Sequence, residues 1–272
     1  IQRYGTEKIG KIFGPVMLIW FLMLAVLGVA ELSTNLSVLK ALNPYYGIWL
    51  LFNSPTGVLI LGAVFLCTTG AEALYSDLGH CGKQNIHYTW IFVKIALVLN
   101  YFGQAAGLLQ HEGQKLVGNP FFNIMPDWFL LIGIIIATLA AIIASQSLIS
   151  GSFTLVSEAI KLNIFPRLTI SYPTNVKGQL YIPAINAWLW AGCMAILFYF
   201  QKASSMEAAY GLSITVAMLM TTLLYYNYLR MKKVPFVLAA VFLGVYVLIE
   251  GVFLYSNLFK FWDGGYITVF IG

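Results

Sequence analysis

Long apolar runs separated by short polar connections dominate the chain. Each run continues for about 20 residues without the alternation of a half-buried strand, which is the length a helix needs to cross a hydrocarbon core of about 30 Å. The pattern predicts an all-α, polytopic transmembrane helix bundle that forms one transmembrane domain over residues 1–272. The expected spans are residues 12–30, 57–75, 88–109, 128–149, 182–200, 208–229 and 235–255, with a truncated eighth from residue 266.

The composition narrows the class of protein further. Of the 272 residues, 60% are hydrophobic and only 9% are charged, which is too little charge to cover a water-soluble surface. A disordered chain would be polar and rich in charge, and a nucleic-acid partner is not expected despite the net charge of +5. A transmembrane barrel would need strands of about ten alternating residues, so helices are favoured.

The basic residues are distributed unequally between the alternate connections. One side of the predicted membrane carries ten and the other carries four, with Lys94 inside a run and left out. The positive-inside rule therefore places the N-terminal end of the chain on the cytoplasmic side of the membrane. The chain begins at Ile1 rather than Met and its last apolar run stops early, so we expect a fragment of a longer protein.

Glu72 is the most informative polar residue at membrane depth. It follows Gly70 in the run VFLCTTGAEALYSDLGH, and Thr69 would share a small, polar helix face with it. Gly70 is a point where the helix could break, and a broken helix supplies backbone carbonyls and helix-end dipoles for a cation. The alternatives are that Glu72 pairs with a basic residue on a neighbouring helix or lies at the membrane edge.

Two further charged residues lie within apolar runs. Glu250, in YVLIEGVFLYS, is either a protonatable acid that carries protons or a structural acid whose hydrogen bonds are satisfied. Lys94 lies close to the start of its run, where its long stem can extend to the membrane interface. The segments 137–160 and 208–222 are rich in small and hydroxylated residues, a composition typical of close helix packing.

Sequence motifs of catalysis are missing from the chain. It contains no GxSxG, HExxH or P-loop pattern, so we do not expect an enzyme or a cofactor. The three histidines, His80, His87 and His111, are expected in loops, and too few ligands surround them in the sequence to suggest a metal site.

Eight segments resemble, in order, the motifs of the KUP/HAK/KT potassium uptake permease family, a branch of the amino acid–polyamine–organocation superfamily. The clearest is GAEALYSDLGHCGK at residues 70–83. The other seven are GKIFGPVMLIWF (10–21), ALNPYY (41–46), LNYFGQAAGLL (99–109), NPFF (119–122), IASQSLISGSFTLVSEAIKL (143–162), GQLYIP (178–183) and AAYGLSITVAMLMTT (208–222).

The resemblance implies a fold and an activity that composition does not reveal. The fold would be similar to that of LeuT-type transporters, with two inverted repeats, and the chain would extend from about helix five to the start of helix twelve. It would then hold the second repeat and its flanking helices. The activity would be K⁺/H⁺ symport by alternating access, with K⁺, H⁺ and the lipid bilayer as partners and a homodimer allowed.

The resemblance also implies roles for single residues. Thr69 matches the helix-six threonine that supplies an oxygen ligand to potassium, and Glu72 matches an acid implicated in proton coupling. Glu250 stands where many members have an aspartate in helix eleven, which implies a second role in proton coupling. The alternative function is an amino-acid or polyamine permease of the same superfamily, which would need a roomier pocket.

Overall fold

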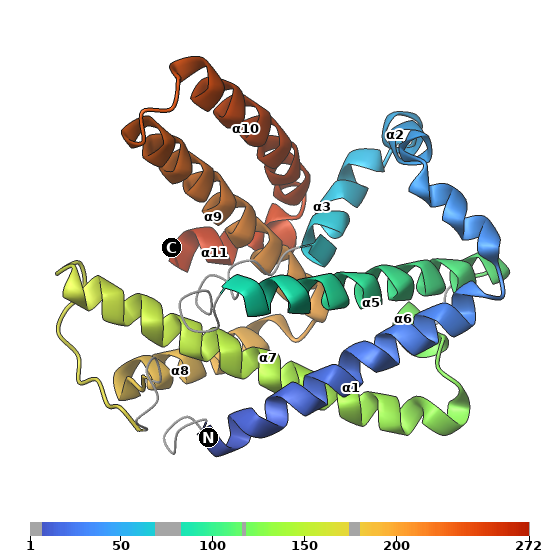
Figure 1. Cartoon of the computed structure of the whole chain (residues 1–272), viewed down its shortest axis with the longest axis horizontal. Coiled ribbons are helices and arrows are strands. Elements are labelled where there is room, and N and C mark those ends of the chain that lie inside the picture. Colours follow the sequence, from blue (N-terminus) through green and yellow to red (C-terminus); the bar gives the residue numbers. More distant parts are fainter. Residues whose placement is uncertain (1–6, 69–82, 116–117, 174–179, 272) are drawn as a thin grey trace. The chain divides into compact units, whose positions relative to one another are not determined.

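A computed structural model describes residues 7–68, 83–115, 118–173 and 180–271, and helices make up most of them. These residues form no strand, although Ser171 and Tyr181 make an isolated antiparallel bridge. Six of the helices are long and apolar enough to cross a membrane (Figure 1). They are α1 (Glu7–Leu32), α5 (Lys83–Gln110), α7 (Asp127–Lys161), α8 (Pro183–Phe200), α9 (Ala203–Met231) and α10 (Phe236–Leu258).

Shorter helical segments connect or flank these six helices. The helix α3 is apolar but ends at the border of the described residues, so the predicted run 57–75 is seen only in its first part. The short segments are η2 (Leu36–Leu42), α2 (Pro44–Asn53), α3 (Gly57–Thr68), α6 (Pro120–Asn123), η3 (Phe261–Gly265) and α11 (Tyr266–Ile271). A polytopic helical bundle is therefore confirmed.

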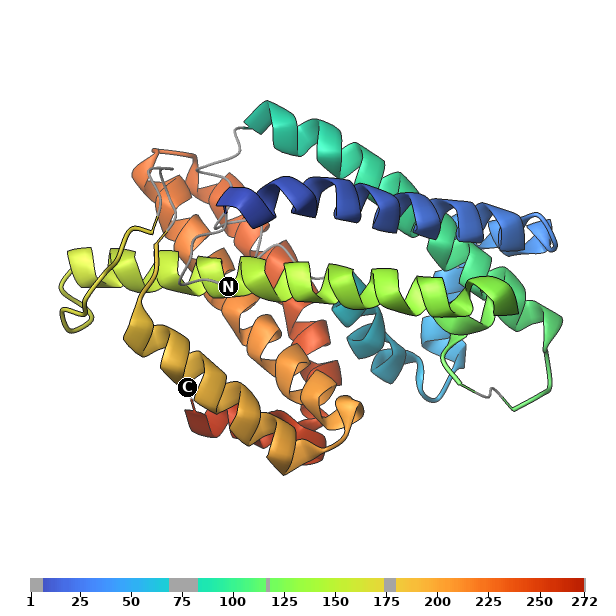
Figure 2. The same ribbon diagram turned by 90° about the horizontal axis from the view of Figure 1, so that it is seen from below.

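Two compact units make up the chain. The first comprises residues 1–43 and 70–190, and the second comprises residues 44–69 and 191–272, so the border falls inside α8. In the first unit α1 packs along α5, and these two helices lie side by side in both ribbon views (Figures 1 and 2). In the second unit α9 and α10 form an antiparallel hairpin, and α3 packs against α10.

Glycine allows α1 and α5 to approach each other closely. A Cβ atom at Gly28 would lie 2.5 Å from the backbone of Leu99, and one at Gly103 would lie 2.6 Å from Gly28 itself. At the same crossing Asn100 is buried and its Nδ2 donates a hydrogen bond to the Leu24 carbonyl oxygen at 3.2 Å. Small residues that bring backbones together are the usual basis of helix association in lipid.

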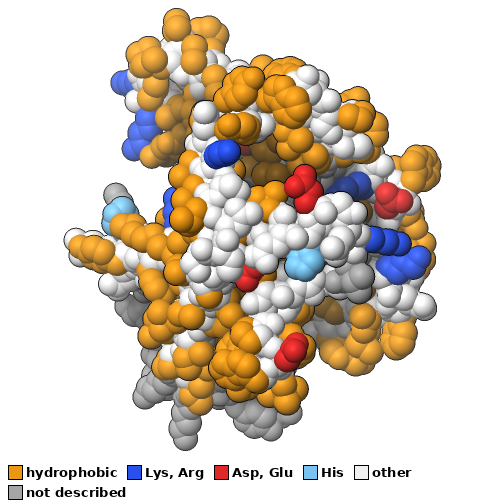
Figure 3. All heavy atoms as spheres, turned by 90° about the vertical axis from the view of Figure 1, so that its right-hand side faces the viewer, with side chains coloured by type: hydrophobic (Ala, Val, Ile, Leu, Met, Phe, Trp, Pro, Cys, Tyr) orange, Lys and Arg blue, Asp and Glu red, His pale blue; other side chains and the backbone are white. Residues whose placement is uncertain are grey.

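Large apolar side chains are exposed over the surface of the described helices. Trp188 in α8 is 76% exposed, and Figure 3 shows hydrophobic side chains spread over one face, with charged side chains between them. Exposed apolar area of this kind is unfavourable in water but natural against lipid chains. This surface and the six long apolar helices indicate a multi-pass membrane protein.

Two helices extend beyond the boundaries that the hydropathy pattern predicts. The helix α5 already begins at Lys83, so His87 lies in a helix and the loop expected for it is wrong. The polar residues before Tyr88 continue the helix because nothing in the segment KQNIH breaks one. The helix α7 continues past the apolar run to Lys161, which the sequence after residue 150 allowed.

Candidate functional site

Glu250 lies in the interior of the second unit, at the contact between α9 and α10. Its side chain is 5% exposed, and its Oε1 accepts a hydrogen bond of 2.7 Å from the hydroxyl of Thr222, which is itself buried. The short turn after Met231 folds α10 back along α9, and a contact between the rings of Tyr225 and Phe242 at 5.3 Å holds the hairpin together. The hairpin thus brings an acid and a hydroxyl together from neighbouring helices.

The second carboxyl oxygen of Glu250 has a different environment. Oε2 is buried and makes no hydrogen bond within the described part of the chain. Across those same residues, the one ion pair joins Lys161 and Glu158, so no lysine or arginine there balances the carboxyl of Glu250. A buried carboxylate without a partner is costly, and binding a proton or a cation relieves that cost. The hairpin thus holds one carboxyl oxygen of Glu250 and leaves the other without a partner among the described residues.

Of the residues predicted to form the site, only Glu250 is described by the structure. Thr69, Gly70 and Glu72 lie outside the described residues, immediately after the end of α3 at Thr68. Their predicted roles as potassium ligand, helix break and proton-coupling acid remain predictions.

Thr222 is a member of the site that the sequence reasoning assigned to packing. The segment 208–222 does pack tightly, since α9 buries Gly211, Leu212 and Thr215 as well as Thr222. The signal that pointed to Thr222 was available: a buried acid within an apolar helix needs a polar partner, and the preceding helix of the hairpin is the nearest source of one.

The ammonium group of Lys94 contacts an aromatic ring of its own helix. Its Nζ lies over the ring of Trp90, 5.3 Å from the ring centre, one turn closer to the start of α5. This contact lies within α5.

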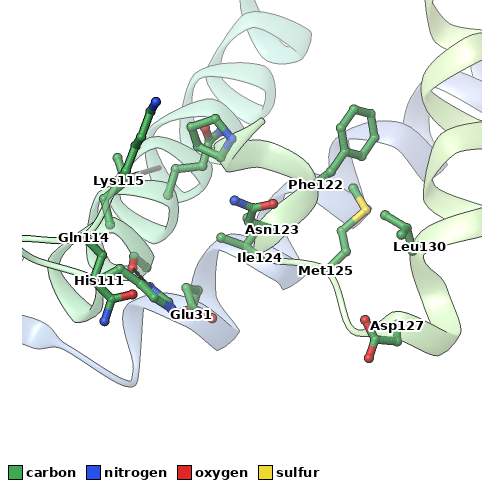
Figure 4. Close-up of a pocket in the computed structure, with 14 residues that line it drawn as sticks. Glu31, His111, Gln114, Lys115, Phe122, Asn123, Ile124, Met125, Asp127 and Leu130 are labelled. Carbon is green, nitrogen blue, oxygen red and sulfur yellow. Dashed lines mark hydrogen bonds between the residues drawn. The ribbon is translucent and has the colours of Figure 1, made fainter. Parts of the chain in front are cut away.

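A cavity of about 490 Å³ opens in the first unit, where the end of α5 meets α6 and the start of α7 (Figure 4). Glu31, His111, Lys115 and Asp127 contribute charged or titratable side chains to its lining, and Gln110 donates a hydrogen bond of 2.8 Å to Glu31. Glu250, the one predicted site residue among those that the structure describes, does not line this cavity. Within the described residues, no three His, Cys, Asp or Glu side chains gather in a way that could hold a metal ion.

Known proteins similar to this chain match it along its full sequence. A protein called "Probable potassium transport system protein Kup" from Clostridium perfringens is 60% identical over 278 residues, which is all of this chain and 42% of that relative. A protein of the same name from Flavobacterium johnsoniae is 56% identical over 277 residues, with the same coverage.

The chain thus spans less than half the length of these curated relatives. The search of solved structures gives no match. All residues from 1 to 272 match the family described as the K⁺ potassium transporter integral membrane domain. The chain therefore belongs to the K⁺ potassium transporter family.

Proposed function

We propose that the protein is a secondary active potassium uptake transporter of the plasma membrane that couples K⁺ entry to H⁺ entry by alternating access. The observation that carries the proposal is the match of the complete chain to the potassium transporter family. The apolar surface and the long helices described above are those a transporter requires. No observation favours an amino-acid or polyamine permease, and the relatives are named for potassium.

Potassium is a weakly hydrated monovalent ion that hydroxyl and carbonyl oxygens hold well, because these oxygens replace its water without binding it too tightly. In the proposal Thr69 supplies such an oxygen, and a helix broken at Gly70 supplies carbonyls. We further propose a LeuT-like inverted-repeat fold, in which α3 is the first half of the broken helix. The N-terminal end of the chain then lies in the cytoplasm.

Proton coupling requires an acid that can lose and regain a proton during the transport cycle. Glu250 supports this part of the proposal, because one of its oxygens is held by Thr222 while the other is buried without a partner in the described residues. A purely structural acid would have both oxygens satisfied. We assign Glu72 the same function within the cation site, where its charge would change with the state of the bound ion.

The test is uptake of K⁺ or Rb⁺ by cells that lack their own K⁺ uptake and express the full-length gene. Glu72→Gln keeps the size of the side chain but cannot exchange a proton, so we expect it to abolish proton-driven uptake. Glu158→Gln is the matched control, because that acid is exposed and paired with Lys161 in its own helix. Near-normal accumulation by the Glu72 variant would refute the coupling role.

A further inference from the structure

Ser256 of α10 makes an unusual contact with the backbone of α3. Its Oγ accepts a hydrogen bond of 2.9 Å from the backbone N–H of Gly62 and donates one of 2.7 Å to the carbonyl oxygen of Val58. An α-helix normally pairs the N–H of residue 62 with the carbonyl of residue 58. One serine hydroxyl therefore bridges the two members of such a pair, although it lies 194 residues from Gly62 in the sequence.

The bridge is buried, and the hydroxyl of Ser256 crowds the position that a Cβ atom on Gly62 would take. Ser256 is 0% exposed, and a Cβ atom on Gly62 would lie 2.7 Å from its Oγ. The neighbouring Asn257 is also buried, and its Oδ1 lies against both Gly62 of α3 and Gly211 of α9. Its Nδ2 donates to the carbonyl oxygen of Phe253, which fixes the side chain on α10. Three helices meet here through two glycines and two polar side chains.

The bridge fixes the position of α3 in a way that apolar packing cannot. In lipid, apolar side chains of two helices can slide with little cost, since lipid and neighbouring side chains are equally apolar. Two hydrogen bonds to defined backbone atoms allow only one register and one rotation. The rings of Phe65 and Phe253, with centres 4.9 Å apart, add a second contact one turn further along α3.

A serine in a transmembrane helix usually bonds to a carbonyl of its own helix, as Ser213 does with Tyr210 in α9. Ser256 instead bonds to α3. The contact is therefore an anchor for α3.

We propose that Ser256 is a positioning residue for cation binding. It acts through α3, whose last described residue, Thr68, directly precedes Thr69 in the sequence. This inference rests on the proposed function, in which Thr69 is a potassium ligand. A shift of α3 at Gly62 would be carried along the helix to Thr68, the residue before that ligand in the sequence. The same helix that holds Ser256 also holds Glu250, so the anchor connects the proton-coupling acid with the cation site.

The first experiment measures uptake kinetics of the full-length protein in cells that lack K⁺ uptake. For Ser256→Ala we expect the K⁺ concentration at half-maximal uptake to rise about tenfold, the effect of losing one or two buried hydrogen bonds. The maximal rate should stay within about twofold, because the variant misplaces a ligand without removing an acid. Ser213→Ala is the control, since it removes a hydroxyl bonded within its own helix. Equal kinetics in the two variants would refute the proposal.

The second experiment replaces the hydrogen bonds by a covalent bond. The Cβ positions of residues 62 and 256 lie 3.5 Å apart, within the range of disulfides, so Gly62→Cys with Ser256→Cys should crosslink on mild oxidation. All native cysteines of the full-length protein, among them Cys67, Cys81 and Cys193, are first replaced by alanine. We expect the oxidised pair to bind K⁺ with near wild-type affinity and the reduced pair to bind it more weakly.

The outcomes separate the two proposals. Loss of uptake in the oxidised pair would show that α3 must move against α10 during transport. Failure to crosslink would show that residues 62 and 256 are not in contact. Either result overturns the positioning role of Ser256. If Ser256→Ala does not reach the membrane, the cysteine pair alone decides. If the wild-type protein takes up no K⁺ or Rb⁺, the proposed function itself fails, whatever the crosslink shows.

Discussion

Replacing Thr222 by valine removes the single hydrogen bond that Glu250 receives within the described residues. Valine matches threonine in shape, so the packing between α9 and α10 stays the same while the donor is lost. The bond is 2.7 Å long, and both side chains are less than 7% exposed, so water cannot replace it easily. Oε2 is already unpartnered, which means that the variant leaves both carboxyl oxygens of Glu250 buried without a partner.

The expected loss of stability in Thr222→Val follows from that geometry. Leaving a buried acceptor unsatisfied lowers the free energy of unfolding by about 1–3 kcal/mol, with the upper end for an ionised carboxylate. Thr222→Ser keeps the hydroxyl and loses one methyl group, so its cost should be about 0.8 kcal/mol or less. Thr221→Val is the matched control, because the adjacent Thr221 is exposed and bonds to Ala217 of its own helix.

The assay is a double-mutant cycle on the free energy of unfolding of the full-length protein in bicelles. In a Glu250→Met background no acceptor is present, so Thr222→Val should cost less than about 0.5 kcal/mol there. The difference between the two backgrounds is the energy of the interaction. An equal cost of Thr222→Val in both backgrounds would refute the hydrogen bond between α9 and α10.

Three further outcomes are expected. Glu250→Gln should reach the membrane but lower proton-driven Rb⁺ uptake by at least about tenfold, while Glu250→Asp keeps part of it, and unchanged uptake by the glutamine variant would exclude a coupling role. Gly28→Ala should destabilise the full-length protein by about 1–3 kcal/mol in the same bicelle assay, because its Cβ has no space against α5. Gly14→Ala, with no atom within 4 Å of the added Cβ, should change stability by less than about 0.5 kcal/mol, and equal effects at the two glycines would contradict the close crossing. Lys94→Met should alter stability by about 1 kcal/mol or less, and leave Rb⁺ uptake intact, so a loss of uptake would assign Lys94 a part in transport.

The sequence predicted a helical membrane protein because a backbone exposed to lipid can adopt few structures. A chain in the hydrocarbon region must satisfy its own N–H and C=O groups, so an apolar run of about 20 residues becomes a helix whatever its neighbours are. The same restriction on charge singled out Glu250 before any contact was known, and it marked the segment 208–222 as a surface for close packing.

Helix boundaries were less predictable from hydropathy. The polar residues at the start of α5 and at the end of α7 are as helical as the apolar residues beside them, since helix formation depends on backbone hydrogen bonds rather than on hydropathy. The predicted residues Thr69, Gly70 and Glu72 were chosen by their sequence pattern and their resemblance to a family, and they stay predictions.

The partners of the buried polar groups were decided by the tertiary structure alone. Thr222 and Glu250 are 28 residues apart, and Gly62 and Ser256 are 194 residues apart, so no local pattern relates them. Each pair depends on the rotation of two helices about their axes, which the packing of glycines and small residues sets. The sequence alone determined that the protein crosses a membrane and that an acid is buried there; only the packing of the helices decided which hydroxyl meets that acid and which serine holds α3.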